Sequence, residues 1–148
     1  MNIYLICTGN TCRSPMAEAI LRSKELGNLT VRSAGINAQD GQLISRHAKT
    51  LIEEADMPYT PWSRAVTGED LESADVVLTM TEGHKAELLY RYPTMREKTF
   101  TLKSFVEFEP GGDVQDPYGG SLDIYRQTFS ELSAVMDRLE QKLTEGKV

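Results

Sequence analysis

The residues best suited to chemistry form one short segment near the N-terminus, Cys7-Thr8-Gly9-Asn10-Thr11-Cys12-Arg13. To hold a phosphoryl dianion and attack its phosphorus, a protein needs inward N–H donors, a planar cation and a nucleophile that ionises near neutral pH. The backbone between Cys7 and Arg13 can supply the donors as a nest, Arg13 supplies a bidentate guanidinium, and Cys7 is the candidate nucleophile. The segment therefore predicts a phosphate-binding loop in which a cysteine attacks.

The residues within and after this loop fit the same chemistry. Ser14 can act as the N-cap of a helix with Pro15 at its first position, which turns the positive end of the helix dipole toward the loop. The helix and the nearby arginine are expected to lower the pKa of the Cys7 thiol from about 8.5 toward ~3.5–7.5, giving a resting thiolate. The Ser14 hydroxyl can donate to that thiolate, and Gly9 and Asn10 tolerate the left-handed backbone of a tight loop.

A simpler interpretation is that Cys7 is a buried small hydrophobic residue and Arg13 a surface cation. The context favours the chemical interpretation, because an apolar strand precedes the loop, glycine and asparagine lie within it, and a Ser-Pro helix start follows it.

Hydrophobic patterning predicts strands that alternate with helices along the chain. The expected strands span residues 2–6, 29–33, 75–79 and 98–102, and the expected helices span about 14–26, 45–55, 82–92 and a long segment from Ser121. This alternation predicts an α/β fold, a single domain built as a three-layer sandwich with a twisted parallel sheet of about four strands and helices on both faces. Ligands of such sheets bind at the carboxyl ends of the strands, where the cysteine loop falls.

Local signals predict where several elements end. Gly27 is expected to end the first helix, the second strand is expected to turn at Ala34-Gly35, and residues 109–113 should form an exposed loop. The last helix should face the core, because its apolar residues recur at steps of three and four: Leu122, Tyr125, Phe129, Leu132, Met136, Leu139 and Leu143.

Composition excludes several classes of protein. The chain has 148 residues, 40% of them hydrophobic, and no apolar run long enough to span a membrane, so a cytoplasmic protein without a membrane partner is expected. Its formal charge of −6 opposes nucleic-acid binding. Two cysteines in one short loop make a poor metal site and a poor structural disulfide, so their use is expected to be chemical.

Taken alone, Asp116-Pro117-Tyr118 is typical of an ordinary turn. Together with the twelve residues from Cys7 to Glu18, however, it resembles the low-molecular-weight protein tyrosine phosphatase family, and the resemblance extends over essentially the whole chain. It implies one catalytic domain over residues 1–148, which acts on phosphorylated proteins through a phosphocysteine on Cys7 and uses no metal or other cofactor. A monomer is expected, although the sequence itself does not decide the oligomeric state.

The resemblance also implies roles for individual residues. Arg13 and the loop amides would stabilise the phosphoryl oxygens, and Asp116 would act as the general acid and later activate water. Ser33 would brace Asn10, although Pro61 stands where the family often has a histidine in this brace. The residues expected to contact the substrate are Thr8, Gly9, Asn10, Thr11, Cys12, Ser14 and Tyr118.

Two departures from the tyrosine-specific pattern concern the substrate. Thr11 is smaller and more polar than the aliphatic residue that many members have, and Gly119 stands where eukaryotic members have a second tyrosine. Both changes favour a guanidinium over a phenyl ring, and the sequence is similar to the bacterial protein arginine phosphatases of this family. The expected activity is therefore hydrolysis of phosphoarginine in proteins, with a protein tyrosine phosphatase as the alternative.

Other interpretations concern the remaining reactive residues. An arsenate reductase of the same fold is less favoured, because its thiol relay needs further cysteines and this chain has only two. Cys12 could form a reversible disulfide with oxidised Cys7, or could simply pack in the loop. His47 and His84 have no metal-ligand partners at recognisable spacing and are expected to be surface or structural residues.

Overall fold

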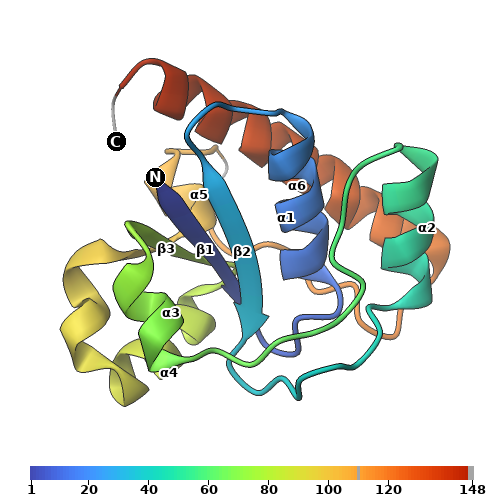
Figure 1. The fold of residues 1–148 in the computed structure, drawn as a ribbon. Coiled ribbons are helices and arrows are strands. Elements are labelled where there is room, and N and C mark those ends of the chain that lie inside the picture. The colour runs from blue at the N-terminus through green and yellow to red at the C-terminus, as the bar shows by residue number, and fades with distance from the viewer. Residues whose placement is uncertain (110, 147–148) are drawn as a thin grey trace.

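The structure, a computed structural model, describes residues 1–109 and 111–146. Four parallel strands form its sheet in the order β2-β1-β3-β4 (Figure 1). Their bounds are β1, Asn2–Cys7; β2, Thr30–Gly35; β3, Val76–Thr79; and β4, Thr99–Thr101. The predicted parallel α/β architecture is confirmed.

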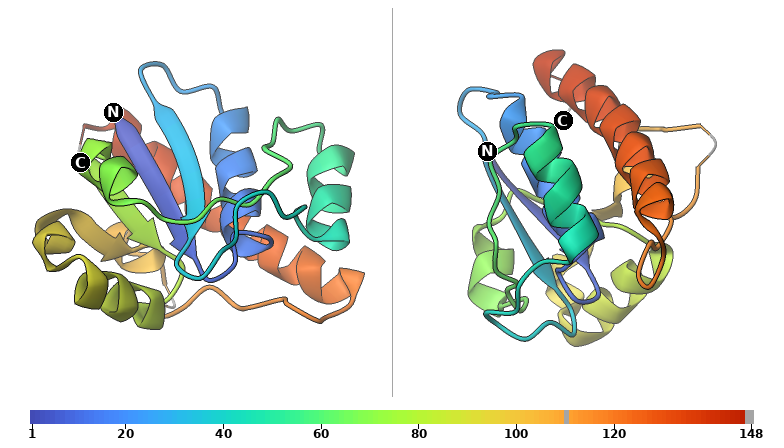
Figure 2. Two further views of the ribbon diagram at one scale, coloured as in Figure 1. Left: turned by 60° about the horizontal axis from the view of Figure 1, so that its bottom comes forward. Right: turned by 90° about the vertical axis from the view of Figure 1, so that its right-hand side faces the viewer.

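Helices cover both faces of the sheet, as Figures 1 and 2 show. One face carries α1 (Arg13–Ser23), α2 (Arg46–Glu54), α5 (Leu102–Phe105) and α6 (Leu122–Thr144). The other carries α3 (Gly68–Ser73), α4 (Glu82–Arg91) and the 3-10 helix η1 (Pro93–Lys98). Alternate residues of β1 serve the two layers, since Ile3 and Leu5 pack with α1 and α6 whereas Tyr4 and Ile6 pack with α3 and α4.

The long helix α6 packs on the sheet through the predicted apolar stripe. Tyr125, Leu132, Met136 and Leu139 are buried, and the stripe continues into partly buried residues at both ends of the helix. Ser121 caps α6 by accepting a hydrogen bond from the Ile124 backbone N–H. This packing fixes the segment just before α6, which contains Asp116, relative to the sheet.

The bounds of α1 differ from the prediction. The helix begins at Arg13, and its N-cap residue is Cys12, which makes no side-chain capping bond. Ser14 is therefore not the cap, because its hydroxyl is bonded to Cys7 and Asn10 instead. The helix also ends at Ser23, before Gly27.

The second strand also differs, because it runs on through Gly35 instead of turning there. Gly35 pairs with Cys7 at the carboxyl edge of the sheet. The short helices α3, η1 and α5 were not predicted, although Thr67 is a recognisable cap for α3 and Pro93 begins η1. Residues 109 and 111–113 are exposed as expected, and Pro110 of this predicted loop lies outside the described residues.

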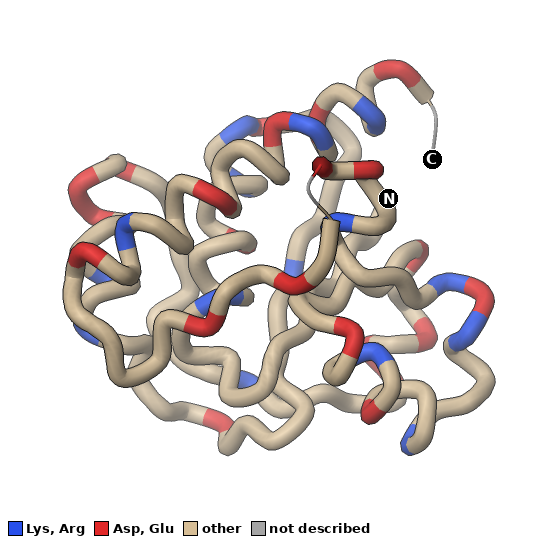
Figure 3. Tube along the Cα trace, turned by 180° about the vertical axis from the view of Figure 1, so that it is seen from behind, with Lys and Arg blue, Asp and Glu red and all other residues tan. Residues whose placement is uncertain are grey.

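Acidic and basic residues are interspersed along the chain. Figure 3 shows both signs alternating on the helices and loops seen from behind, with no long basic segment on the part of the chain it colours. Among the described residues, no helix is long and apolar enough to cross a membrane.

Gly35 offers a test of how closely the strand edge approaches the cysteine loop. A Cβ at this position would overlap the Thr8 carbonyl oxygen and lie 2.8 Å from the Asn10 backbone nitrogen. Because both are backbone atoms that cannot move aside, Gly35→Ala should lower the free energy of unfolding by about 1–3 kcal/mol, measured by urea denaturation. Gly27→Ala is the control, since a Cβ there meets nothing within 4 Å and should be neutral or stabilise by up to about 1 kcal/mol. Equal stability of the two variants would contradict this account.

Candidate active site

A cavity of about 230 Å³ opens at the carboxyl end of β1. Its lining joins two segments that lie more than a hundred positions apart in the sequence, the cysteine loop and the turn before α6. The lining residues are Cys7, Thr8, Gly9, Thr11, Cys12, Arg13, Asp116 and Tyr118. Of the residues predicted to form the site, only Asn10 and Ser14 do not line the cavity; both are buried.

The loop takes its shape from the abrupt change from strand to helix. β1 ends at Cys7 and α1 begins at Arg13, so residues 8–12 must reverse the chain within a few positions. Asn10 adopts the left-handed backbone, with φ 56°, as its residue type allows. Gly9 does not use a positive φ. The left-handed conformation thus falls on a loop residue whose polar side chain is buried.

Cys7 lies at the floor of the cavity, only 3% exposed, with its Sγ 2.8 Å from the Ser14 Oγ. Burial raises the pKa of the Cys7 thiol above its ordinary value. Hydrogen bonds from Ser14 and from the Asn10 backbone, together with the charge of Arg13, act in the opposite direction but are outweighed. The predicted lowering of this pKa is therefore wrong, although the predicted donors are present.

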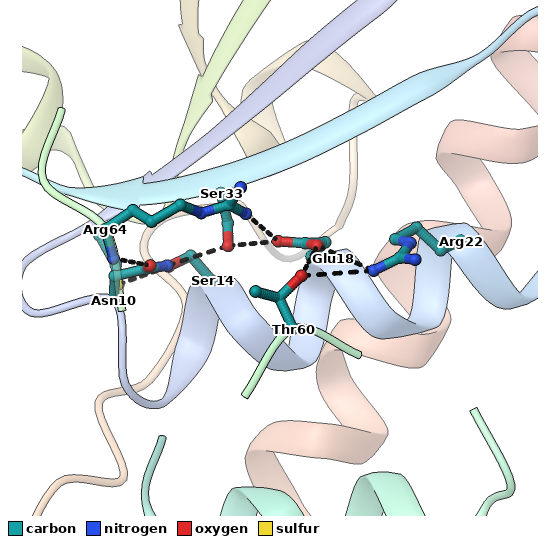
Figure 4. A network of polar contacts seen from close by, with 8 residues as sticks. Asn10, Ser14, Glu18, Arg22, Ser33, Thr60 and Arg64 are labelled. Atoms are coloured by element: carbon teal, nitrogen blue, oxygen red, sulfur yellow. Dashed lines mark hydrogen bonds and ion pairs between the residues drawn. The ribbon is translucent and has the colours of Figure 1, made fainter. Parts of the chain in front are cut away.

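A chain of buried hydrogen bonds supports the loop from behind (Figure 4). The Glu18 carboxylate can only accept, so the Ser33 hydroxyl, 2.6 Å away, donates to it. The Asn10 Oδ1 accepts from the Arg64 backbone N–H at 2.8 Å, which leaves the Asn10 amide nitrogen to donate to Ser33 at 2.9 Å. The predicted contact between Ser33 and Asn10 is confirmed.

The same chain of hydrogen bonds sets the direction of the bond between Ser14 and Cys7. The second N–H of the Asn10 amide donates to the Ser14 Oγ at 2.8 Å. Because Ser14 accepts this bond, its own hydrogen is free to point at the Cys7 Sγ. Ser14 is therefore placed to stabilise a thiolate when one forms.

Glu18, at the far end of this chain, was quoted in the sequence motif but not recognised as important. Its carboxylate is buried and accepts from Thr60 at 3.1 Å, and it pairs with Arg22 at 3.2 Å and Arg64 at 3.3 Å (Figure 4). Arg64 and Thr60 thus complete the brace in which the family often has a histidine, and Pro61 takes no side-chain part in it. A glutamate on a buried helical face, with an arginine four positions later, was the available signal.

Arg13 and Asp116 meet at the cavity. The buried Arg13 donates to the Val114 carbonyl oxygen at 3.0 Å, and its other terminal nitrogen lies 3.6 Å from the Asp116 carboxylate. The Asp116 side chain is 57% exposed and accepts a hydrogen bond from the Tyr118 backbone N–H. Tyr118 is itself 80% exposed, so the carboxylate and the tyrosine stand at the open side of the cavity.

Cys12 occupies the wall of the loop that faces α6. Both cysteines are free thiols, and the Cys12 Sγ lies 3.2 Å from the Tyr125 hydroxyl. Burial, followed by the contact with Cys12, raises the pKa of Tyr125 to about 12. Packing and polar contact account for Cys12 in this structure, and a disulfide with Cys7 stays a prediction.

The two histidines have different surroundings. His47 packs edge-on against the Tyr125 ring, with ring centroids 5.2 Å apart. His84 contacts the cysteine loop directly, since its Nε2 lies 2.7 Å from the Thr8 Oγ1. Neither belongs to a group of three or more metal-ligating side chains within residues 1–109 and 111–146. The sequence did not reveal that His84 adjoins the site.

A buried cysteine and arginine in a loop after a parallel strand, with a carboxylate above them, define a cysteine-dependent phosphatase. The chain belongs to the low molecular weight phosphotyrosine protein phosphatase family, whose model matches residues 2–148.

Individual relatives are similar over nearly their whole length. An arginine phosphatase structure from Geobacillus stearothermophilus matches with a TM-score of 0.94 and 42% identity, covering 99% of this chain and 94% of that one. The low molecular weight protein-tyrosine-phosphatase PtpB of Staphylococcus epidermidis is 39% identical, over 96% of this chain and 99% of that protein. A cysteine-to-serine mutant of an arginine phosphatase, solved with its active-site serine phosphorylated, matches with a TM-score of 0.92 and 43% identity, covering 97% of this chain and 96% of that one.

Replacing Glu18 tests the hydrogen-bond chain. Glu18→Gln removes the charge that pairs with Arg22 and Arg64 and replaces one of the two acceptor oxygens by an NH2 group, which cannot accept. At least one buried donor then loses its acceptor, so the free energy of unfolding should fall by about 1–3 kcal/mol. Glu54→Gln is the matched control, because Glu54 pairs with Arg126 where both side chains are about half exposed. That change should cost less than about 1 kcal/mol in the same urea titration. A Glu18 variant no less stable than the control would show that this chain of hydrogen bonds does not stabilise the loop.

Proposed function

We propose that the protein is a protein arginine phosphatase, which removes phosphoryl groups from arginine side chains of other proteins. The observation that carries this proposal is the position of Thr11 in the wall of the cavity that also contains Cys7 and Arg13. A threonine wall is short and polar, and its hydroxyl can accept a hydrogen bond from a guanidinium N–H. The names of the relatives from Geobacillus and of the phosphorylated mutant support the same substrate class.

The first step of the proposed reaction transfers the phosphoryl group to Cys7. The thiolate sulfur forms a bond to phosphorus while the bond from phosphorus to the guanidine nitrogen breaks. Arg13 and the backbone N–H groups of the loop stabilise the equatorial phosphoryl oxygens. Asp116 donates its proton to the leaving nitrogen, and the Ser14 hydroxyl supports the ionised sulfur.

The second step returns the enzyme to its starting state. Asp116, now ionised, accepts a proton from a water molecule whose oxygen attacks the phosphorus. The bond between sulfur and phosphorus breaks, inorganic phosphate leaves, and Cys7 is free again. All groups used come from one chain, so we propose a monomer whose catalytic domain spans residues 1–148.

The open side of the cavity is compatible with a flexible, planar side chain. Gly119 has φ 78°, and a Cβ at this position would meet nothing within 4 Å. Because glycine has no side chain, the aromatic ring at the mouth of the cavity is that of the exposed Tyr118. The exposed Tyr118 ring can stack on a guanidinium plane as well as on a phenyl ring.

A protein tyrosine phosphatase is the second candidate. The similarity to PtpB favours it, and the exposed Tyr118 ring is compatible with either substrate. The expected partners are phosphorylated proteins in either case, with no nucleic acid and no membrane. Free cysteines used for chemistry suit a reducing compartment such as the cytoplasm.

Asp116→Asn tests the general acid. The amide has no proton to give, so kcat on a phosphoarginine peptide should fall by about 100-fold or more in steady-state kinetics. Asp113→Asn is the control, because Asp113 lies in the same segment, accepts a hydrogen bond from the Glu82 backbone N–H and does not line the cavity. Loss of kcat by similar factors in both variants would argue against the role of Asp116.

Thr11→Ile tests the substrate class. We expect the unchanged protein to have the higher kcat/KM on a phosphoarginine peptide than on the matching phosphotyrosine peptide. The replacement should reduce this ratio by about tenfold or more, because the larger apolar wall removes a hydrogen-bond partner for the guanidinium. Cys7→Ser should abolish turnover of both peptides. A preference for phosphotyrosine that Thr11→Ile leaves unchanged would overturn the arginine assignment.

A further inference from the structure

His84 lies beside the cysteine loop (residues 7–13) without being part of it. It sits in the first turn of α4, where the Thr81 Oγ1 accepts a hydrogen bond from its backbone N–H, and it is only 9% exposed. Its Nε2 lies 2.7 Å from the Thr8 Oγ1, although 76 positions separate the two residues. The ring nitrogen Nδ1 is buried and has no hydrogen-bond partner among the described residues.

The unpartnered Nδ1 decides which nitrogen carries the hydrogen. A buried N–H without an acceptor is among the rarest arrangements in proteins, whereas an acceptor with an unused lone pair is tolerated more often. Burial and the charge of Arg13 also lower the pKa of His84 to about 4, against the opposing influence of Asp113 and Asp116, so the ring is neutral. The hydrogen of the neutral ring therefore belongs on Nε2, which donates to Thr8.

This arrangement leaves the Thr8 hydroxyl with a hydrogen to give. A hydroxyl has one hydrogen and can accept as well as donate. Because Thr8 accepts from His84, it need not donate back. Thr8 is exposed and lines the cavity that contains Cys7 and Arg13, so its free hydrogen is available to an acceptor bound there. The phosphoryl oxygens of a substrate are the strongest acceptors this cavity would hold.

We propose that His84 is a positioning residue that makes the Thr8 hydroxyl a hydrogen-bond donor to the phosphoryl oxygens of the substrate. The proposal rests on the assignment of this cavity to phosphoryl groups, and not on the identity of the leaving group. His84 itself touches only Thr8. Its effect is to add a side-chain donor to the backbone nest without adding another positive charge beside Arg13.

The test replaces His84 by Gln and by Asn, two residues whose side-chain amides extend to different distances from the backbone. The nitrogen of Gln can occupy the position of Nε2, whereas the nitrogen of Asn can reach only that of Nδ1. We expect His84→Asn and Thr8→Val each to raise the inhibition constant of orthovanadate by about tenfold, the effect of losing one charge-assisted hydrogen bond, with p-nitrophenyl phosphate as the substrate. His84→Gln should keep the inhibition constant within about twofold of that of the unchanged protein. The variant that combines His84→Asn with Thr8→Val should raise this constant no more than the larger of the two single changes does.

Several outcomes would overturn the proposal. A Thr8→Val variant with unchanged vanadate inhibition, equal losses in the Gln and Asn variants, or losses that multiply in the double variant would each assign His84 a structural role only. Because vanadate and p-nitrophenyl phosphate contain neither arginine nor tyrosine, the result is independent of the peptide comparison that tests the arginine assignment.

A spectroscopic measurement on the unchanged protein covers the case in which a His84 variant does not fold. Nitrogen-15 labelling of the two histidines should show one ring that keeps its hydrogen on Nε2 from about pH 5 to 8. Thr8→Val identifies this ring as that of His84, because it should shift the Nε2 resonance of the histidine that contacts Thr8. A hydrogen on Nδ1, or a charged ring at neutral pH, would contradict the proposal.

Discussion

The side-chain amide of Asn10 anchors the cysteine loop (residues 7–13) to the rest of the fold, and the shape of the site depends on it. Its oxygen accepts from the Arg64 backbone and its two N–H groups donate to Ser14 and Ser33, so the amide uses both hydrogens and its oxygen within the buried network. The Arg64 carbonyl in turn accepts from the Gly35 backbone N–H at 2.9 Å. One amide therefore ties together the loop, the helix that follows it, the edge of β2 and the segment beyond residue 60. A loop whose backbone N–H groups must stay available to a bound ligand cannot use them for hydrogen bonds within the loop. The hydrogen bonds of the Asn10 side chain stabilise the loop in their place.

Burial of Cys7 creates a conflict that the same brace addresses. The Cys7 thiol at the floor of the cavity is shielded from water, which opposes its ionisation and raises its pKa. The compensation comes from donors that are already in place, since the Ser14 oxygen accepts from Asn10 and leaves the Ser14 hydrogen free to point at the sulfur. Such donors need no rearrangement when charge develops, which is the property that makes a preorganised site effective. The buried Glu18 fixes the direction of the hydrogen bond at the other end of this network, so a carboxylate outside the cavity influences the hydrogen bond at the Cys7 sulfur.

Periodicity and local chemistry predicted the parts of the structure that depend on neighbours in sequence. The strand before Cys7, the left-handed Asn10 and the apolar stripe of α6 were all visible in this way. The mistakes share a different physical origin. Ser14 has the residue type of a helix cap, but its hydroxyl has a tertiary partner that competes with capping. The pKa of Cys7 depends on how completely the folded chain excludes water, and the contact of His84 joins two segments that no local pattern connects.

The two ends of the cavity differ in how firmly they are held. The phosphoryl end is buried and braced through Asn10, Arg13 and Ser14, whereas Asp116 and Tyr118 at the other end are mostly exposed. A buried network loses much when any member changes, because each lost partner leaves an unpaired polar group behind. Exposed residues carry no such penalty, so a substitution at the open end should cost the fold less than a substitution within the buried network. The chain is similar over nearly its whole length both to a relative named for arginine and to one named for tyrosine. Thr11 combines the two situations, because it belongs to the braced loop by sequence and lines the wall of the cavity by position.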